Sequence, residues 1–151
     1  GLVPYGDIVP MTAECPTLTF NTIGRHQSRL VRTRVASNLS PWLAKTEVGD
    51  MHTIAISHGE GRFVASDDML AQLKANGQIA TQYVDEAGVP GMDLSVNPNG
   101  SLLAIEGITS PDGRVFGKMG HSERYSNGTF KNVPGEKDQP LFAAGVEYFA
   151  A

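Results

Sequence analysis

The first half of the chain contains two segments with the polarity pattern of β-strands. Over residues 31–35, β-branched residues alternate with arginines, so that a strand here would bury one face and expose the other to solvent. Residues 52–58 (HTIAISH) are more continuously apolar and predict a second strand, near the centre of the sheet. The loop of residues 59–66 (GEGRFVAS) follows it.

A helix is predicted between Ser66 and Gly77. Ser66 is a suitable N-cap, and Asp67 and Asp68 would face the positive end of the helix dipole. Gly77 is suited to end the helix just beyond Lys74. The predicted apolar stripe consists of Met69, Leu70 and Leu73.

The second half of the chain predicts a strand, a hairpin and a closing helix. Residues 78–85 form the strand, and residues 102–121 form a hairpin around the turn Pro-Asp-Gly. A loop over residues 126–137 leads to a helix capped by Asp138, with Pro140 in its first turn. The predicted apolar face of that helix consists of Leu141, Phe142, Val146 and Phe149.

Strands mixed with helices predict an α/β layer fold with some antiparallel pairing. The first segment carries prolines at positions 4, 10 and 16 and predicts irregular structure, and the strand count is low for a complete α/β domain. We therefore expect the chain to be a piece of something larger.

Composition and charge narrow the class of protein. The 151 residues suit one domain, and a net charge of −4 without a basic stripe argues against a nucleic-acid surface. A single cysteine fits a reducing compartment, no apolar run approaches the roughly 20 residues that cross a bilayer, and no signal peptide is recognisable. The expected location is the cytoplasm.

The segment GKMGHSERY (117–125) contains the candidate chemistry. In an extended segment, His121 and Glu123 would point to the same side, so that the carboxylate could orient the imidazole as a general base. Such a pair needs a thiol or hydroxyl to deprotonate. From the residues alone, a polar turn in solvent remains the competing interpretation.

Two other chemistries fit the residues poorly. Cys15 is the only thiol, but Pro16 has no N–H to offer an oxyanion and Thr17 would crowd a nucleophile elbow. His58 and Glu60 repeat the spacing of His121 and Glu123, but the Cys-x-x-Cys that completes a zinc deaminase is absent. No metal site is predicted.

Several strings in their order resemble one family. TLTFNTIGRHQSRLV, ISHGEGRFVA, NPNGS and AIEGITSPDGRVFGKMGHSER are similar to the C-terminal glutaminase domain of phosphoribosylformylglycinamidine synthase, a class I glutamine amidotransferase. The resemblance covers nearly all of the chain from Pro4 to Arg124. It implies an α/β, Rossmann-like class I amidotransferase fold, with a mixed sheet and flanking helices, incomplete here, and a partial glutaminase domain over residues 1–151.

The resemblance also implies roles for individual residues. His121 would be the general base and Glu123 its orienter, while His58, Glu60 and Arg62 would border the glutamine pocket or the contact with the synthetase domain. The family more often has a proline on each side of the histidine. Because Gly120 and Ser122 stand there in this chain, we expect a less constrained backbone.

The resemblance places the nucleophile outside the chain. The family's cysteine lies in a GxCNG-like elbow just before the stretch that matches GLVPYG, where this sequence begins. We therefore expect this fragment to be inactive alone and its missing strands to expose a sheet edge that favours a homodimer. No cofactor is expected in this domain; ATP and magnesium would bind the synthetase domain. A non-catalytic interaction module and a stand-alone glutaminase subunit remain alternatives.

Overall fold

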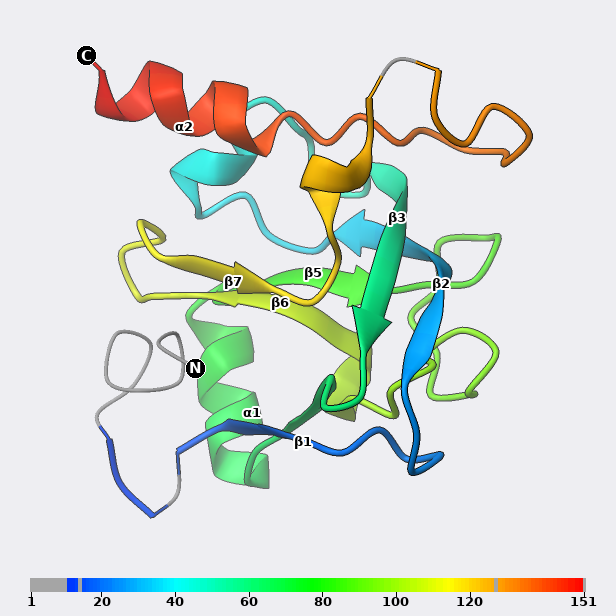
Figure 1. The fold of residues 1–151 in the computed structure, drawn as a ribbon. Helices are drawn as coiled ribbons and strands as arrows, with labels where there is room; N and C mark the ends of the chain where they lie inside the picture. The colour runs from blue at the N-terminus through cyan, green and yellow to red at the C-terminus, as the bar shows by residue number, and fades with distance from the viewer. Residues whose placement is uncertain (1–10, 14, 127, 151) are drawn as a thin grey trace.

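A five-stranded sheet forms the centre of the computed structural model, which describes residues 11–13, 15–126 and 128–150. The strand order is β3-β2-β5-β6-β7 (Figure 1). The strands are β2 (Gln27–Val35), β3 (Met51–His58), β5 (Ile79–Tyr83), β6 (Ile105–Thr109) and β7 (Phe116–Lys118). All neighbouring strands of this described sheet pair antiparallel.

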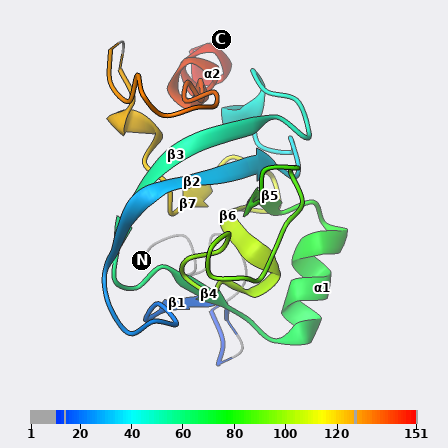
Figure 2. The same cartoon turned by 90° about the vertical axis from the view of Figure 1, so that its right-hand side faces the viewer.

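Two layers cover the sheet. Helix α1 (Asp67–Ala75) and a two-stranded ribbon of β1 (Thr17–Thr19) and β4 (Arg62–Val64) lie on one side, and α2 (Leu141–Phe149) lies on the other (Figures 1 and 2). The α1 layer encloses an apolar cluster around Phe63 and Leu73, and the α2 layer encloses one around Leu43 and Leu141. The expected α/β class is confirmed, although none of the described strands forms the parallel pair that a mixed sheet would contain.

Helix α1 forms as its sequence predicts. The Ser66 side chain accepts a hydrogen bond from the backbone N–H of Met69, and the helix ends at Ala75, just before Gly77 with φ of 69°. Leu70 and Leu73 are buried against the sheet. Local capping and periodicity are therefore sufficient to specify this element.

The predicted central position of β3 is wrong, because this strand stands at the edge of the sheet. Its outer edge is partly covered by later parts of the chain: the N–H of His121 donates to the carbonyl of Ala55, and the N–H of Thr53 donates to that of Glu136. The strand is apolar because Ile54 and Ile56 are buried, Ile56 in a cluster with Val31, Tyr83 and Ala104.

Helix α2 differs from its prediction at its start and on its buried face. The helix begins at Leu141 with Pro140 as N-cap, so Asp138 does not cap it. Leu141, Ala144 and Gly145 are buried, while Phe142, Val146 and Phe149 are exposed. The helix presents its small residues to the protein because Gly145 lies against the ring of Trp42.

Candidate active site

The β6–β7 hairpin delivers His121 to its place. Beyond β7 the chain passes Gly120, and His121 forms an isolated bridge with Ala55 of β3. The short 3-10 helix η4 (Ser122–Arg124) starts immediately afterwards, with His121 as its N-cap. The backbone of His121 is therefore held between the hairpin and the edge strand β3.

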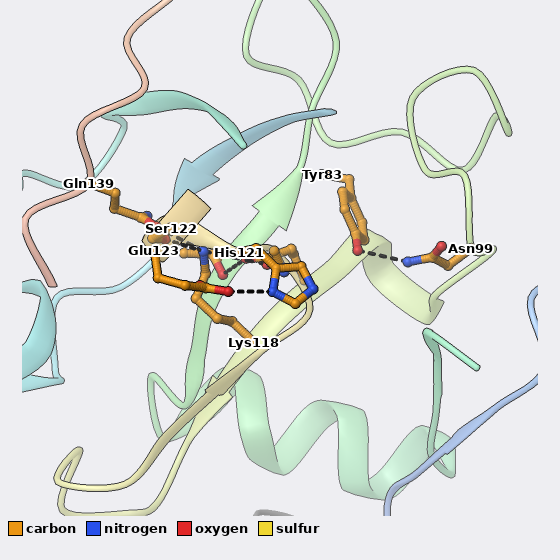
Figure 3. Close-up of polar contacts among 10 residues, drawn as sticks. Tyr83, Asn99, Lys118, His121, Ser122, Glu123 and Gln139 are labelled. Carbon is orange, nitrogen blue, oxygen red and sulfur yellow. Dashed lines mark hydrogen bonds and ion pairs between the residues drawn. The ribbon is translucent and has the colours of Figure 1, made fainter. Parts of the chain in front are cut away.

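The predicted contact between His121 and Glu123 is confirmed. The Nδ1 of His121 lies 2.7 Å from Oε1 of Glu123, and 31% and 56% of the two side chains are exposed (Figure 3). The expected extended backbone is wrong, since residues 122–124 form the 3-10 turn. The 3-10 turn brings the Glu123 carboxylate to the imidazole ring. The contact therefore does not depend on side chains two residues apart pointing to the same side of a strand.

The local electrostatics favour an ionised carboxylate. Burial raises the pKa of Glu123, but its own backbone N–H, the hydrogen bond from His121 and the charges of His121 and Arg124 together bring that pKa below its usual range. An ionised carboxylate only accepts hydrogen bonds, so Nδ1 of His121 must donate the proton. In the neutral ring, Nε2 is then unprotonated and can accept one.

A depression of about 420 Å³ opens beside this pair. It is lined by β7, by residues 119–123 and by the start of α2, including Phe142. The site thus combines an available base with space for a small molecule or for another segment of polypeptide.

A buried polar network lies next to the pair, and the sequence analysis missed it. Glu106 of β6 and Lys118 of β7 have side chains that are 0% and 10% exposed, with Nζ 3.7 Å from Oε1. Burial lowers the pKa of Lys118, and the charges of Glu106 and Glu123 act in the opposite direction. For Glu106 the signal was present in the sequence, because this residue places a charge inside the otherwise uncharged arm of residues 102–110.

Of the three candidates His58, Glu60 and Arg62, only His58 has an electrostatic interaction with His121. Burial lowers the pKa of His58, the neighbouring Asn99 side chain raises it, and the proximity of His121 lowers it again. Neither ring nitrogen of His58 has a hydrogen-bond partner in the described structure. Glu60 is exposed, and Arg62 donates from Nε to the carbonyl of Gly100, so the structure does not bring these two to His121.

Cys15 belongs to another part of the molecule. Its side chain is partly buried against the apolar cluster under α1, and the N–H of Thr12 donates to its Sγ over 3.1 Å. The depression beside His121 is lined by none of the residues of that cluster. Among the described residues, no group of three or more His, Cys, Asp and Glu side chains could hold a metal ion.

A family model described as CobB/CobQ-like glutamine amidotransferase domain matches residues 1–149. The phosphoribosylformylglycinamidine synthase subunit PurQ of Aquifex aeolicus is 39% identical over 102 residues, which are 68% of this chain and 44% of that protein. The subunit of the same name from Methanosarcina mazei is 35% identical over 131 residues, which are 87% of this chain and 54% of that protein. The resemblance inferred from the motifs is confirmed.

A solved structure supports the same relationship. The structure of PurLQS from Thermotoga maritima matches with a TM-score of 0.64 and 28% identity, over 88% of this chain and 52% of the matched one. The chain spans about half the length of the curated relatives that it matches. Within the described part of the chain, no helix has the length and apolar character needed to cross a membrane.

Proposed function

Because this chain belongs to the CobB/CobQ-like glutamine amidotransferase domain family, we propose that it supplies the base of a glutaminase that releases ammonia from glutamine. The observation that carries the proposal is the 2.7 Å contact between His121 Nδ1 and Glu123 Oε1. This contact leaves Nε2 free to remove a proton from a nucleophile.

The proposed reaction uses that contact. Nε2 of His121 takes the proton of a cysteine thiol, and the thiolate attacks the side-chain amide carbon of glutamine. Backbone N–H groups stabilise the resulting oxyanion. When the C–N bond breaks, the imidazolium returns its proton to the departing nitrogen as ammonia, leaving a thioester. Water, deprotonated by the same ring, then hydrolyses the thioester to glutamate and frees the thiol.

The nucleophile in this scheme is a cysteine outside this chain. Cys15 fits the role poorly, because its sulfur packs in the α1 layer and Pro16 follows it. A glycine-flanked cysteine on an elbow preceding Gly1, as the resemblance implies, would meet Nε2 across the depression beside His121.

The partner proposed for this domain is a synthetase that consumes the ammonia. The matched relatives are named as subunits of phosphoribosylformylglycinamidine synthase, and the matched structure is titled PurLQS. We propose that the intact protein likewise feeds ATP-dependent amidine formation in purine biosynthesis, with ATP and magnesium bound by the synthetase. A homodimer of the chain stays a prediction.

Two observations favour the alternative of a non-catalytic interaction module. The residues flanking His121 depart from the family's prolines, and α2 presents an exposed apolar face that includes Phe142 and Val146. An in-frame Gly-x-Cys-x-Gly upstream of Gly1 in the gene favours the enzyme, and its absence favours the module. The length of that reading frame separates a fused synthetase from a stand-alone subunit.

The test compares variants of the full-length polypeptide encoded by the gene. His121→Ala should lower the glutaminase kcat by about 10²–10⁴-fold, because the base is removed. Glu123→Gln should give a smaller loss, since the ring remains but its orientation is less fixed. His26→Ala is the matched control, because His26 is exposed and bonds only Ser57 among the described residues. Equal activity of His121→Ala and the wild type would overturn the proposal.

A further inference from the structure

The buried pair of Glu106 and Lys118 needs a reason beyond stability. Both side chains are withdrawn from water, at 0% and 10% exposure, and their charged atoms are 3.7 Å apart. Two charges taken from water into a protein lose hydration that their attraction only partly replaces, so that an apolar pair of similar volume is often as stable. Such a pair is better explained by what it holds in place.

The hydrogen bonds of the pair lead to the two residues that flank His121. Oε1 of Glu106 accepts the backbone N–H of Gly120 over 2.5 Å. Nζ of Lys118 donates to Oγ of Ser122 over 3.0 Å. His121 therefore lies between two residues, Gly120 and Ser122, and each of them is hydrogen-bonded to one member of the buried pair.

Two further side chains complete the network. Thr81 Oγ1 donates to the second oxygen of Glu106 over 2.5 Å. Gln139, from the segment before α2, accepts from Lys118 Nζ over 2.8 Å and from Ser122 Oγ over 2.7 Å (Figure 3). Both charged residues thus have fixed partners beyond each other, so the network can define a single geometry.

The identity of residue 120 fits this network. A Cβ at Gly120 would lie 2.7 Å from Cγ2 of Ile54 and 2.8 Å from Oε1 of Glu106, which leaves no room for a side chain. A proline at 120 would lack the N–H that Glu106 accepts, and a proline at 122 would lack the hydroxyl. Hydrogen bonds therefore anchor Gly120 and Ser122 where the family more often has prolines, while the lesser constraint expected of this backbone stays a prediction.

We propose that Glu106 and Lys118 are positioning residues for His121. They hold the backbone on both sides of the imidazole, so that Nδ1 faces Glu123 and Nε2 remains free to accept a proton. The pose is a property of this chain alone. Its use in glutamine hydrolysis rests on the proposed function.

Nuclear magnetic resonance of this chain tests the pose without any enzymatic activity. In the wild type, the ¹⁵N shifts of His121 should report a proton on Nδ1, and the Gly120 amide should exchange slowly with solvent. Lys118→Met removes the donor to Ser122 and leaves the buried Glu106 carboxylate without its counter-charge. We expect the His121 signals to move toward a mixture of tautomers, because Ser122 is no longer held. We also expect Gly120 exchange to accelerate on the order of tenfold, because an uncompensated carboxylate turns toward water and releases the Gly120 N–H.

A second pair of variants separates charge from hydrogen bonding. Glu106→Gln combined with Lys118→Met removes both charges but keeps an oxygen for the Gly120 N–H, so Gly120 protection should partly return. Ser122→Ala leaves no buried charge without a partner. It should shift the His121 signals and leave Gly120 exchange unchanged. If Lys118→Met fails to fold, Ser122→Ala decides the question.

Ser110→Ala is the control for general loosening of the hairpin. Ser110 is buried at the opposite end of the β6–β7 hairpin, where its Oγ bonds Asp112 and the N–H of Val115. This variant should destabilise the chain and leave the His121 tautomer unchanged.

Unchanged His121 and Gly120 signals in Lys118→Met and in Ser122→Ala would overturn the positioning role. A correct pose in a full-length protein without glutaminase activity would instead contradict the proposed function.

Discussion

His52 makes stability depend on pH at the residue scale. It is 5% exposed and faces Thr33 across the β2–β3 pair. Burial lowers its pKa from 6.5, and Lys118 adds to this effect, while Asp50, Glu136 and Asp138 oppose it. Below pH 6.5 the unfolded chain takes up a proton that the folded chain resists, so the free energy of unfolding should fall as the pH falls through this window.

Urea unfolding at about pH 8 and about pH 5.5 measures this dependence. His52→Gln should reduce the difference between the two midpoints. His58 retains part of the dependence in this variant, because burial lowers its pKa as well. Equal differences in wild type and His52→Gln would contradict this assignment.

The two polar contacts beside the site differ in whether sequence reasoning could predict them. The contact of His121 with Glu123 could be predicted, because the partners are two residues apart and complementary in chemistry. The contact of Lys118 with Glu106 could not, because it depends on the register of the β6–β7 hairpin, which pairs Lys118 with Gly107. A contact that depends on register can be predicted only when the turn and the strand pairing are known.

At the scale of elements, local signals were sufficient for α1 and insufficient for α2 and β3. The capping serine and the apolar stripe of α1 act within the helix itself, so sequence reasoning found its ends and its buried face. The position of β3 in the sheet depends on strand order and on which loop covers its edge, neither of which is local. The orientation of α2 depends on Trp42, a hundred residues earlier, which packs where Gly145 leaves space.

Gly145 supplies the prediction at this scale. Alanine is the better helix former by about 1 kcal/mol, so propensity alone predicts that Gly145→Ala stabilises the chain. A Cβ at this position would overlap the ring of Trp42, and we expect a net loss of about 1–3 kcal/mol in the free energy of unfolding. Ala143→Gly, at an exposed position of the same helix, should show the propensity effect alone. Stabilisation by Gly145→Ala would show that the helix does not depend on this close approach.

At the scale of the whole molecule, the fold assembles one side of the proposed reaction centre. The edge strand β3 bridges His121, and the buried network ties the hairpin to the segment before α2. From the sequence, the motifs predicted the family and the contact of His121 with Glu123. They could not predict how the imidazole is held, because the holding residues come from β5, β6, β7 and the segment before α2.

The central claim is that His121 is the base for a sulfur nucleophile outside this chain. Ammonia release from glutamine, measured in parallel for the isolated chain, its Cys15→Ser variant and the full-length polypeptide, tests it most directly. The account predicts that, of the three samples, only the full-length polypeptide releases ammonia. Both forms of the isolated chain should stay at the level of buffer. Turnover by the isolated chain that disappears in Cys15→Ser would contradict it.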